Sequence, residues 1–164
     1  MTYEKELHDC HKSKTGILIV DDHPIVRRGL MQLINQECDL VVCAEAESAE
    51  EALAAVKTHR IDLAIVDISL IGTNGLKLTT KIKEQRPHLP VLILTMHDEA
   101  RYAESAFKAG AGGYVTKQEA AETIITAIRL VLGGQRYLSK TRAEKLPRDT
   151  GYKAADCARR EFKS

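Results

Sequence analysis

With 164 residues, of which 44% are hydrophobic, 29% are charged and only 14 are Pro or Gly, the chain can form one globular domain and is not collagen-like, coiled-coil or wholly disordered. No apolar run approaches the roughly 18 residues of a membrane span, and residues 1–14 lack a secretion signal, so we expect a cytoplasmic protein that does not bind membranes. Residues 1–139 contain 16 Lys or Arg against 19 Asp or Glu, a balance of −3, which is not the charge of a nucleic-acid-binding surface.

Five short aliphatic runs, at residues 17–20, 40–43, 61–66, 91–94 and 113–115, are predicted to be strands. None alternates with polar residues, so each strand is expected to be covered on both faces. Helical patterns follow the runs. The first starts at Pro24, the second at Ser48 with a capping box to Glu51, the third spans 76–85, the fourth ends at Gly110 and the fifth spans 119–132.

This alternation predicts an α/β fold, a five-stranded parallel sheet with helices on both faces. Right-handed crossovers favour the flavodoxin-like strand order 2-1-3-4-5. We expect a folded domain over 15–138, a flexible tail over 1–14 and a linker with a disordered basic tail over 139–164, because residues 147–164 contain no Ile, Leu or Val. The cluster His8, Cys10 and His11 lacks a second ligand pair and is assigned to the first tail.

Polar side chains stand at the ends of four predicted strands. Asp21 and Asp22 follow the first strand, Asp67 the third, Thr95 the fourth and Lys117 the fifth. A single Asp at such a place is more often a helix cap, but in a parallel α/β sheet all these ends meet at one edge, where ligands bind. Three carboxylates repel one another unless a cation intervenes, and oxygen ligands suit Mg²⁺.

With Mg²⁺ offsetting the charge, one carboxylate of this group is free to attack phosphorus and form an aspartyl-phosphate. Thr95 and Lys117 would then contact the phosphoryl oxygens. The sequence therefore predicts phosphoryl-transfer chemistry at the carboxyl edge of the sheet.

The pair Asp21-Asp22, the run Leu-Ala-Ile-Val-Asp ending at Asp67, Thr95 and the segment 113–117 ending at Lys117 together resemble the receiver domain of bacterial two-component response regulators. The resemblance covers residues 15–138. The segments Asp-Asp-His-Pro (21–24), Leu-Thr-Met-His-Asp (94–98) and Ala-Gly-Ala-Gly-Gly-Tyr (109–114) resemble the NarL/FixJ (LuxR-type) subgroup.

The resemblance implies a phosphorelay role, in which Asp67 accepts a phosphoryl group from a sensor histidine kinase. It implies that Mg²⁺ is bound by Asp22, by Asp67, by Asp21 through water and by the backbone carbonyl of Ser69. It also implies that Lys117 binds phosphate. The chain would be a signalling phosphoacceptor and not an enzyme, with only slow self-catalysed phosphotransfer and dephosphorylation.

The resemblance further implies that Thr95 and Tyr114 form a switch pair, in which the Tyr114 ring turns inward on phosphorylation. The family usually has Pro where this chain has Ile71, so a looser loop is expected there, while the family's Gly is present as Gly75. The broad apolar arc of the fifth helix suits core packing and also a homodimer face.

Regulators of this subgroup normally continue into a helix-turn-helix DNA-binding domain, but only 18 residues follow Leu146. DNA contact and transcription regulation are therefore expected only through an effector domain absent from this chain. Two other functions stay open. An Asp-nucleophile phosphohydrolase typically has an acid at the position of Ser69 and a substrate cap, and a pseudo-receiver interaction module typically lacks the acceptor or the acidic pair.

Overall fold

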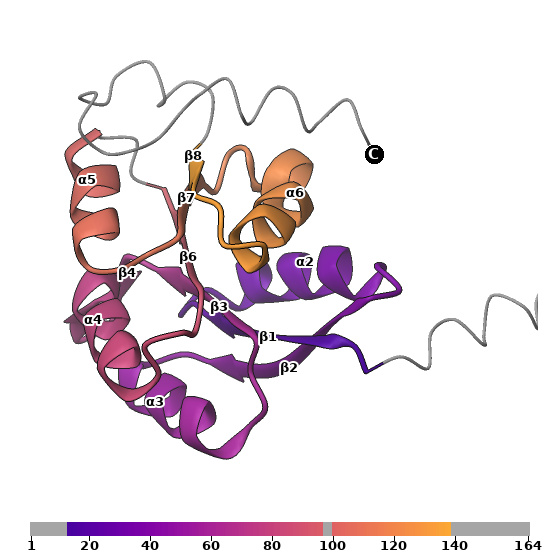
Figure 1. Ribbon diagram of the computed structural model, residues 1–164, viewed down its shortest axis with the longest axis horizontal. Coiled ribbons are helices and arrows are strands. Elements are labelled where there is room, and N and C mark those ends of the chain that lie inside the picture. The colour runs from indigo at the N-terminus through magenta and orange to yellow at the C-terminus, as the bar shows by residue number, and fades with distance from the viewer. Residues whose placement is uncertain (1–12, 97–99, 139–164) are drawn as a thin grey trace, which may run out of the picture.

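The structure, a computed structural model, describes residues 13–96 and 100–138. In this part of the chain six parallel strands form one sheet in the order β2-β1-β3-β6-β7-β8, with helices on both faces (Figure 1). The elements in chain order are β1 (Thr15–Val20), α2 (Pro24–Asn35), β2 (Leu40–Ala46), α3 (Ala49–Thr58), β3 (Leu63–Asp67), β4 (Ser69–Leu70), β5 (Thr73–Asn74), α4 (Gly75–Gln85), β6 (Val91–Thr95), α5 (Ala100–Lys108), β7 (Gly113–Thr116), α6 (Ala120–Leu132) and β8 (Tyr137–Leu138).

The predicted order 2-1-3-4-5 is confirmed by β2-β1-β3-β6-β7, and two features were not predicted. The two-residue strand β8 adds a sixth strand beside β7, where Gly113 is in register with Tyr137. A two-stranded antiparallel pair, β4-β5, follows Asp67. All three of these strands have only two residues, which is too short for a hydrophobic pattern to be recognised.

The core lies in two layers because each central strand buries side chains on both faces. Along β1, Ile17 and Ile19 pack on one side and Leu18 and Val20 on the other, and all four are fully buried. Helices α2 and α6 cover the first side, and α3, α4 and α5 cover the second (Figure 1). This double cover explains the lack of polar alternation in the strands.

Hydrogen bonds fix the start of α3 nearly as predicted. The Ser48 hydroxyl accepts a bond from the backbone N–H of Glu51 at 3.2 Å. The Glu51 carboxylate, however, accepts from the N–H of Glu47 at 2.9 Å and not from that of Ser48. The reciprocal bond of the capping box is thus displaced by one residue toward the N-terminus.

Two glycines end the last two long helices by the same device. Gly110 and Gly134 have positive φ angles of 104° and 80°. After each of them the next N–H bonds to a carbonyl five residues earlier, from Ala111 to Ala106 and from Gln135 to Leu130. This is the Schellman motif, which returns the chain sharply toward β7 and β8.

In the ranges 13–96 and 100–138 no helix combines the length and the apolar character needed to cross a membrane. The cluster of His8, Cys10 and His11, nearly all of the predicted tail over 1–14 and the whole of residues 139–164 lie outside the described residues.

Candidate functional site

The predicted carboxylates meet at the carboxyl edge of the sheet. Asp21 and Asp22 follow β1, and Asp67 is the last residue of β3, the strand next to β1. Asp21 is 1% exposed and Asp67 is 2% exposed, although both are acids. The aliphatic strands bring them there because Val20 and Val66, in register with each other, are fixed in the core.

The ammonium of Lys117 joins two of these acids. Its Nζ lies 3.0 Å from Asp67 Oδ2 and 2.8 Å from Asp21 Oδ2. The backbone N–H of Lys117 donates to the carbonyl of Thr95 at 2.8 Å, which ties the end of β7 to the end of β6. Four of the predicted residues therefore lie in one continuous group.

The carboxylates outnumber the cation that contacts them. Asp21, Asp22 and Asp67 carry three negative charges against the one positive charge of Lys117, a balance of −2. Among the described residues, Asp21 Oδ2 and Asp22 Oδ1 are buried without a hydrogen bond, although Lys117 Nζ lies 2.8 Å from the first and His23 Nδ1 lies 2.9 Å from the second. Buried oxygens of this kind fit a divalent cation that prefers oxygen ligands, such as Mg²⁺.

Burial and the neighbouring charges shift the pKa values in different directions. Burial raises the pKa of Asp67, and the charge of Asp21 raises it further, against the opposing effect of Lys117. Burial also acts to raise the pKa of Asp21, but the contacts with Lys117 and His23 outweigh it and the pKa is lowered. For Lys117 burial acts to lower the pKa, and the two carboxylates raise it overall. The negative charge of Asp67 is thus less well stabilised than that of Asp21.

The loop after Asp67, where a looser loop is expected from Ile71, contains the two-stranded pair β4-β5. The N–H of Ser69 donates to Asp67 Oδ1 at 3.2 Å, and Ser69 pairs with Asn74 across the β4-β5 pair. Gly75 begins α4 close to Asp67, and a Cβ at this position would overlap the carbonyl oxygen of Asp67. Glycine is required at this position by the close approach of two backbone segments.

The predicted switch residues lie on adjacent strands behind the pocket. Thr95 ends β6 and is fully buried, and Tyr114 in β7 pairs with Ile93 of β6. The Tyr114 ring is also fully buried, within the core layer under α3, α4 and α5. The inward position expected after phosphorylation is therefore already occupied in this structure.

Two contributors to the site, His23 and Arg27, were not predicted. His23 is the N-cap residue of α2, and its ring Nδ1 lies 2.8 Å from Asp21 Oδ1. Arg27 donates to the backbone carbonyl of Asp21 at 2.6 Å and to Glu47 Oε1 at 2.7 Å. The signal for His23 was its place directly after the acidic pair.

The comparisons with known proteins agree with this geometry. A family model, the response regulator receiver domain, matches residues 17–129. The response regulator UvrY of Escherichia coli (strain K12) is 33% identical over 131 residues, which cover 80% of this chain and 60% of UvrY. The oxygen regulatory protein NreC of Staphylococcus epidermidis is 41% identical over 123 residues, which cover 74% of this chain and 56% of NreC. The chain thus spans less than two thirds of these curated relatives.

A solved structure is similar over most of its length. The two-component response regulator of the LuxR family from Aurantimonas sp. SI85-9A1 is 38% identical, with a TM-score of 0.77 over 80% of this chain and 94% of that one. The resemblance seen in the sequence is therefore confirmed. The chain belongs to the response regulator receiver domain family, in the NarL/FixJ (LuxR-type) subgroup.

Proposed function

We propose that residues 15–138 carry a signal as a phosphoryl group on Asp67, taken from the phosphohistidine of a sensor histidine kinase. The observation that carries the proposal is the surroundings of Asp67, a buried carboxylate with Lys117 Nζ at 3.0 Å and two further acids beside it. Burial and the charge of Asp21 raise the pKa of Asp67, so the reactive carboxylate is poorly stabilised as an anion. Bonding to phosphorus removes the charge of the carboxylate and brings that of the phosphoryl oxygens, which Lys117 and a bound cation would offset.

In the proposed transfer, an oxygen of Asp67 forms a bond to phosphorus while the bond from phosphorus to the donor imidazole breaks. The donor ring leaves with the electron pair of that bond. Lys117 Nζ is already 3.0 Å from the Asp67 carboxylate and contacts a phosphoryl oxygen. The hydroxyl of Thr95 contacts another, because Thr95 follows Leu94, the residue of β6 that pairs with Asp67. Both groups offset negative charge that accumulates on phosphorus.

As direct ligands of Mg²⁺ we assign Asp22 and Asp67, with Asp21 acting through water and the Ser69 carbonyl as a further oxygen. The balance of −2 and the buried oxygens without hydrogen bonds support this set. Bound there, the ion supplies the positive charge that lets a carboxylate and a phosphoryl group approach each other.

Three exposed apolar side chains surround the pocket and suit the docking of the kinase. Ile25 is 85% exposed in the first turn of α2, Ile71 is 79% exposed between β4 and β5, and Met96 is 62% exposed directly after β6. All three lie at the carboxyl edge of the sheet, where Asp67 is. Side chains of this kind around an acidic pocket favour a partner that covers them while it reaches Asp67.

The proposed output is a shift between two states of Thr95 and Tyr114. A phosphoryl group on Asp67 offers acceptor oxygens to the Thr95 hydroxyl, and the movement of Thr95 makes the inward position of Tyr114 the favoured one.

A second copy of the chain is the second proposed partner, since Ala121 is exposed and Ile125 is half-buried on α6. A cytoplasmic location, and DNA contact only through an effector domain, complete the proposal.

Mass spectrometry after incubation with acetyl phosphate and Mg²⁺ tests this function. The wild-type chain should gain one acid-labile phosphoryl group, and Asp67→Asn should gain none. Asp39→Asn is the matched control, because Asp39 is 61% exposed and lies away from the pocket. Equal labelling of Asp67→Asn refutes the assignment. Rapid, continuous release of phosphate would favour the phosphohydrolase, and no labelling of the wild type would favour the pseudo-receiver.

A further inference from the structure

Two open clefts adjoin at the amino edge of the sheet, where the strands begin, opposite the acidic pocket. The first, of about 490 Å³, is lined by residues 61–62 and 85–90, which lie before β3 and β6. The second, of about 300 Å³, is lined by residues before β6, β7 and β8. His88 and Pro90 line both clefts, so the two form one groove. Each volume is within the roughly 300–1,000 Å³ of ligand-binding clefts.

This amino-edge groove has a net positive charge. Three of its lining side chains are cations, Lys83, Arg86 and Arg136. Asp62 is the one acid among the lining residues, which gives a balance of +2. The Oδ2 atom of Asp62 accepts the backbone N–H of Gly16 at 2.8 Å, so this carboxylate already has a partner. In the described part of the chain neither Lys83 nor Arg86 forms an ion pair with a carboxylate.

Lys83 is held in the groove by neutral groups alone. Its Nζ donates to the carbonyl of Leu89 at 3.0 Å. Gly110 approaches its stem so closely that a Cβ there would lie 3.0 Å from Lys83 Cγ. Burial lowers the pKa of the Lys83 ammonium, which means that its positive charge is poorly stabilised. An anion that binds beside Lys83 would find the ammonium in place and would stabilise its charge.

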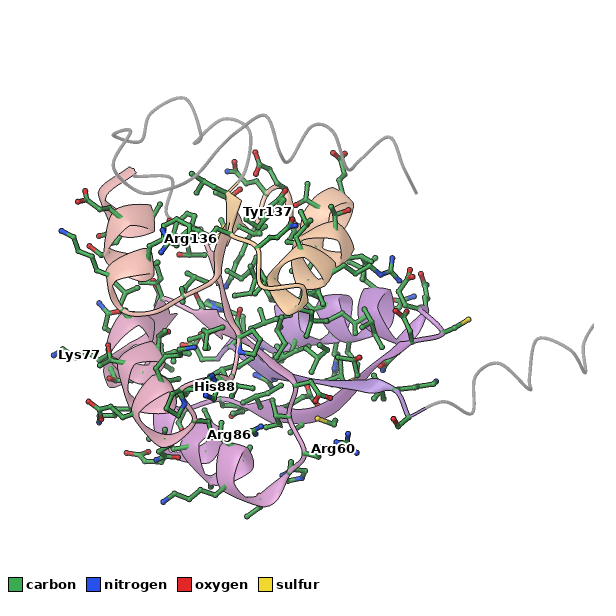
Figure 2. All side chains as sticks on the ribbon, in the orientation of Figure 1. Arg60, Lys77, Arg86, His88, Arg136 and Tyr137 are labelled. Atoms are coloured by element: carbon green, nitrogen blue, oxygen red, sulfur yellow. The ribbon has the colours of Figure 1, made fainter. Side chains whose placement is uncertain are left out.

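A tight turn presents two further polar groups to the groove. The N–H of Leu89 donates to the carbonyl of Arg86 at 3.1 Å, which closes a β-turn with Pro87 and His88 at its centre. The side chains of Arg86 and His88 lie next to each other in Figure 2. Pro87 restricts the backbone of this turn, so little backbone freedom is lost when a ligand binds.

Cations near helix C-termini also offset the helix dipole, which is the alternative role of these side chains. Helices α4, α5 and α6 all end at this edge of the sheet. Backbone N–H groups, however, already bond to carbonyls in the last turn of each helix, at Ile82 of α4 and in the Schellman motifs of α5 and α6. The charged side chains are therefore not required as caps. The partial negative charge of three helix ends also makes the edge unfavourable for a concentrated anion such as phosphate.

We propose that the amino-edge groove binds an extended acidic peptide of a partner protein, whose carboxylates pair singly with Lys83, Arg86 and Arg136. Single charges spread along a peptide suit cations that come from α4, from the turn after it and from the loop before β8. Apolar side chains of the peptide can cover Pro87 and Pro90, which line the groove between the charges. Nucleic acid suits it less, because its binding depends on many phosphate contacts and the groove has three cations.

Amide NMR titration of the full chain with a peptide of three Glu-Glu-Leu-Pro repeats tests the proposal. The shifts of residues 83–89, 110–112 and 134–136 should change, with a dissociation constant below about 1 mM in about 50 mM NaCl. A peptide of three Gln-Gln-Leu-Pro repeats should change none of them at the same concentration. Binding to residues 139–164, which carry 8 Lys or Arg against 4 Asp or Glu, is read separately from their own amides.

Three variants remove one charge each, Lys83→Gln, Arg86→Gln and Arg136→Gln. Each should weaken binding of the Glu peptide by at least about threefold, and Lys83→Gln combined with Arg86→Gln by at least about tenfold. Arg86→Lys keeps the charge and should bind more tightly than Arg86→Gln. Lys77→Gln is the matched control, because Lys77 is an exposed cation of the same helix that lines neither cleft (Figure 2). It should change the affinity by less than about twofold.

Unchanged affinity in the combined variant, equal binding of the Gln peptide, or shifts confined to residues 139–164 overturns the proposal. Inorganic phosphate that causes the same shifts at a lower concentration would assign the groove to a small anion instead. A thymidine oligonucleotide that binds there more tightly than the Glu peptide would assign it to nucleic acid. If the three variants lose stability in urea but keep their affinity for the Glu peptide, the cations serve the helix ends and the proposal is wrong.

Discussion

Replacing Lys117 by Met removes the positive charge between Asp21 and Asp67 and keeps a side chain of similar length. In the wild type, Nζ lies 2.8 Å from one carboxylate and 3.0 Å from the other, and the side chain is only 8% exposed. The variant therefore leaves two buried negative charges side by side. We expect it to unfold more easily at neutral pH in the absence of Mg²⁺.

The distances set the size of the effect. Two unit charges 3 Å apart attract by about 5.5 kcal/mol at an effective dielectric constant of 20, and burying the ammonium offsets part of this. Removing one partner of a buried ion pair typically costs about 3–5 kcal/mol. We expect the free energy of unfolding to fall by about 3 kcal/mol. The loss is at the lower end because Asp21 still accepts a hydrogen bond from the N–H of His23, and Asp67 from that of Ser69.

Urea denaturation at pH 7 with EDTA measures the loss. Because the pKa of Lys117 is raised in the folded chain, its contribution to stability is present at pH 7 and is lost only as the pH rises above the ordinary lysine value of about 10.4. Lys108→Met is the matched control. Lys108 is 76% exposed and pairs only with Glu104 at 3.2 Å among the described residues, so it should cost no more than about 0.5 kcal/mol.

A second variant tests the cause of the loss. Lys117→Met combined with Asp67→Asn has one buried charge fewer and should recover part of the stability. If the double variant is no more stable than Lys117→Met alone, or if Lys117→Met costs less than about 1 kcal/mol, the electrostatic reasoning is wrong.

In calorimetric titrations, Asp22→Ala should bind Mg²⁺ at least about tenfold more weakly, and unchanged affinity would place the ion elsewhere. In urea without Mg²⁺, Asp67→Asn should be more stable than the wild type at pH 7, because burial and Asp21 raise the pKa of Asp67. That gain should vanish as the pH falls below the ordinary carboxyl value of about 3.9, where Asp67 is neutral whether folded or unfolded, and a gain independent of pH would contradict it. With beryllofluoride as phosphate mimic, Thr95→Ala should lose the amide shift changes at residues 98–116, and undiminished changes would show another route of coupling. Gly75→Ala should lower the free energy of unfolding by at least about 3 kcal/mol, because its Cβ meets the carbonyl of Asp67. Gly29→Ala, which has open space around its Cβ, should stabilise α2 by about 0.5–1 kcal/mol. Equal stabilities of the two variants in urea would refute the clash.

The strand order could be predicted because every long strand is covered on both faces. That cover leaves continuous aliphatic runs such as residues 17–20, which are recognisable without knowledge of their neighbours. The short strands could not be predicted for the opposite reason. The pairing of Gly113 with Tyr137, and of Ser69 with Asn74, depends on where the chain has already been placed by other elements.

The acidic residues of the site were predictable from their place at strand ends, whereas the role of His23 was not. The residue types and strand order bring Asp21 and Asp67 to one edge, as expected. The position of the His23 ring depends on the φ and ψ angles before Pro24, a detail that residue spacing does not contain. The inward ring of Tyr114 is likewise a matter of side-chain rotation, which no sequence pattern specifies.

The close approach of Gly75 to Asp67 couples the position of α4 to the backbone of Asp67. The backbone N–H of Gly75 donates to the carbonyl of Ile68 at 2.8 Å, so the first turn of the helix is fixed to the residue after Asp67. The 11 residues of α4 span about 16 Å at 1.5 Å per residue, so a tilt of about 4° at its start displaces its far end by about 1 Å. Backbone displacement at Asp67 is therefore magnified near Gln85, at the edge of the sheet farthest from the pocket.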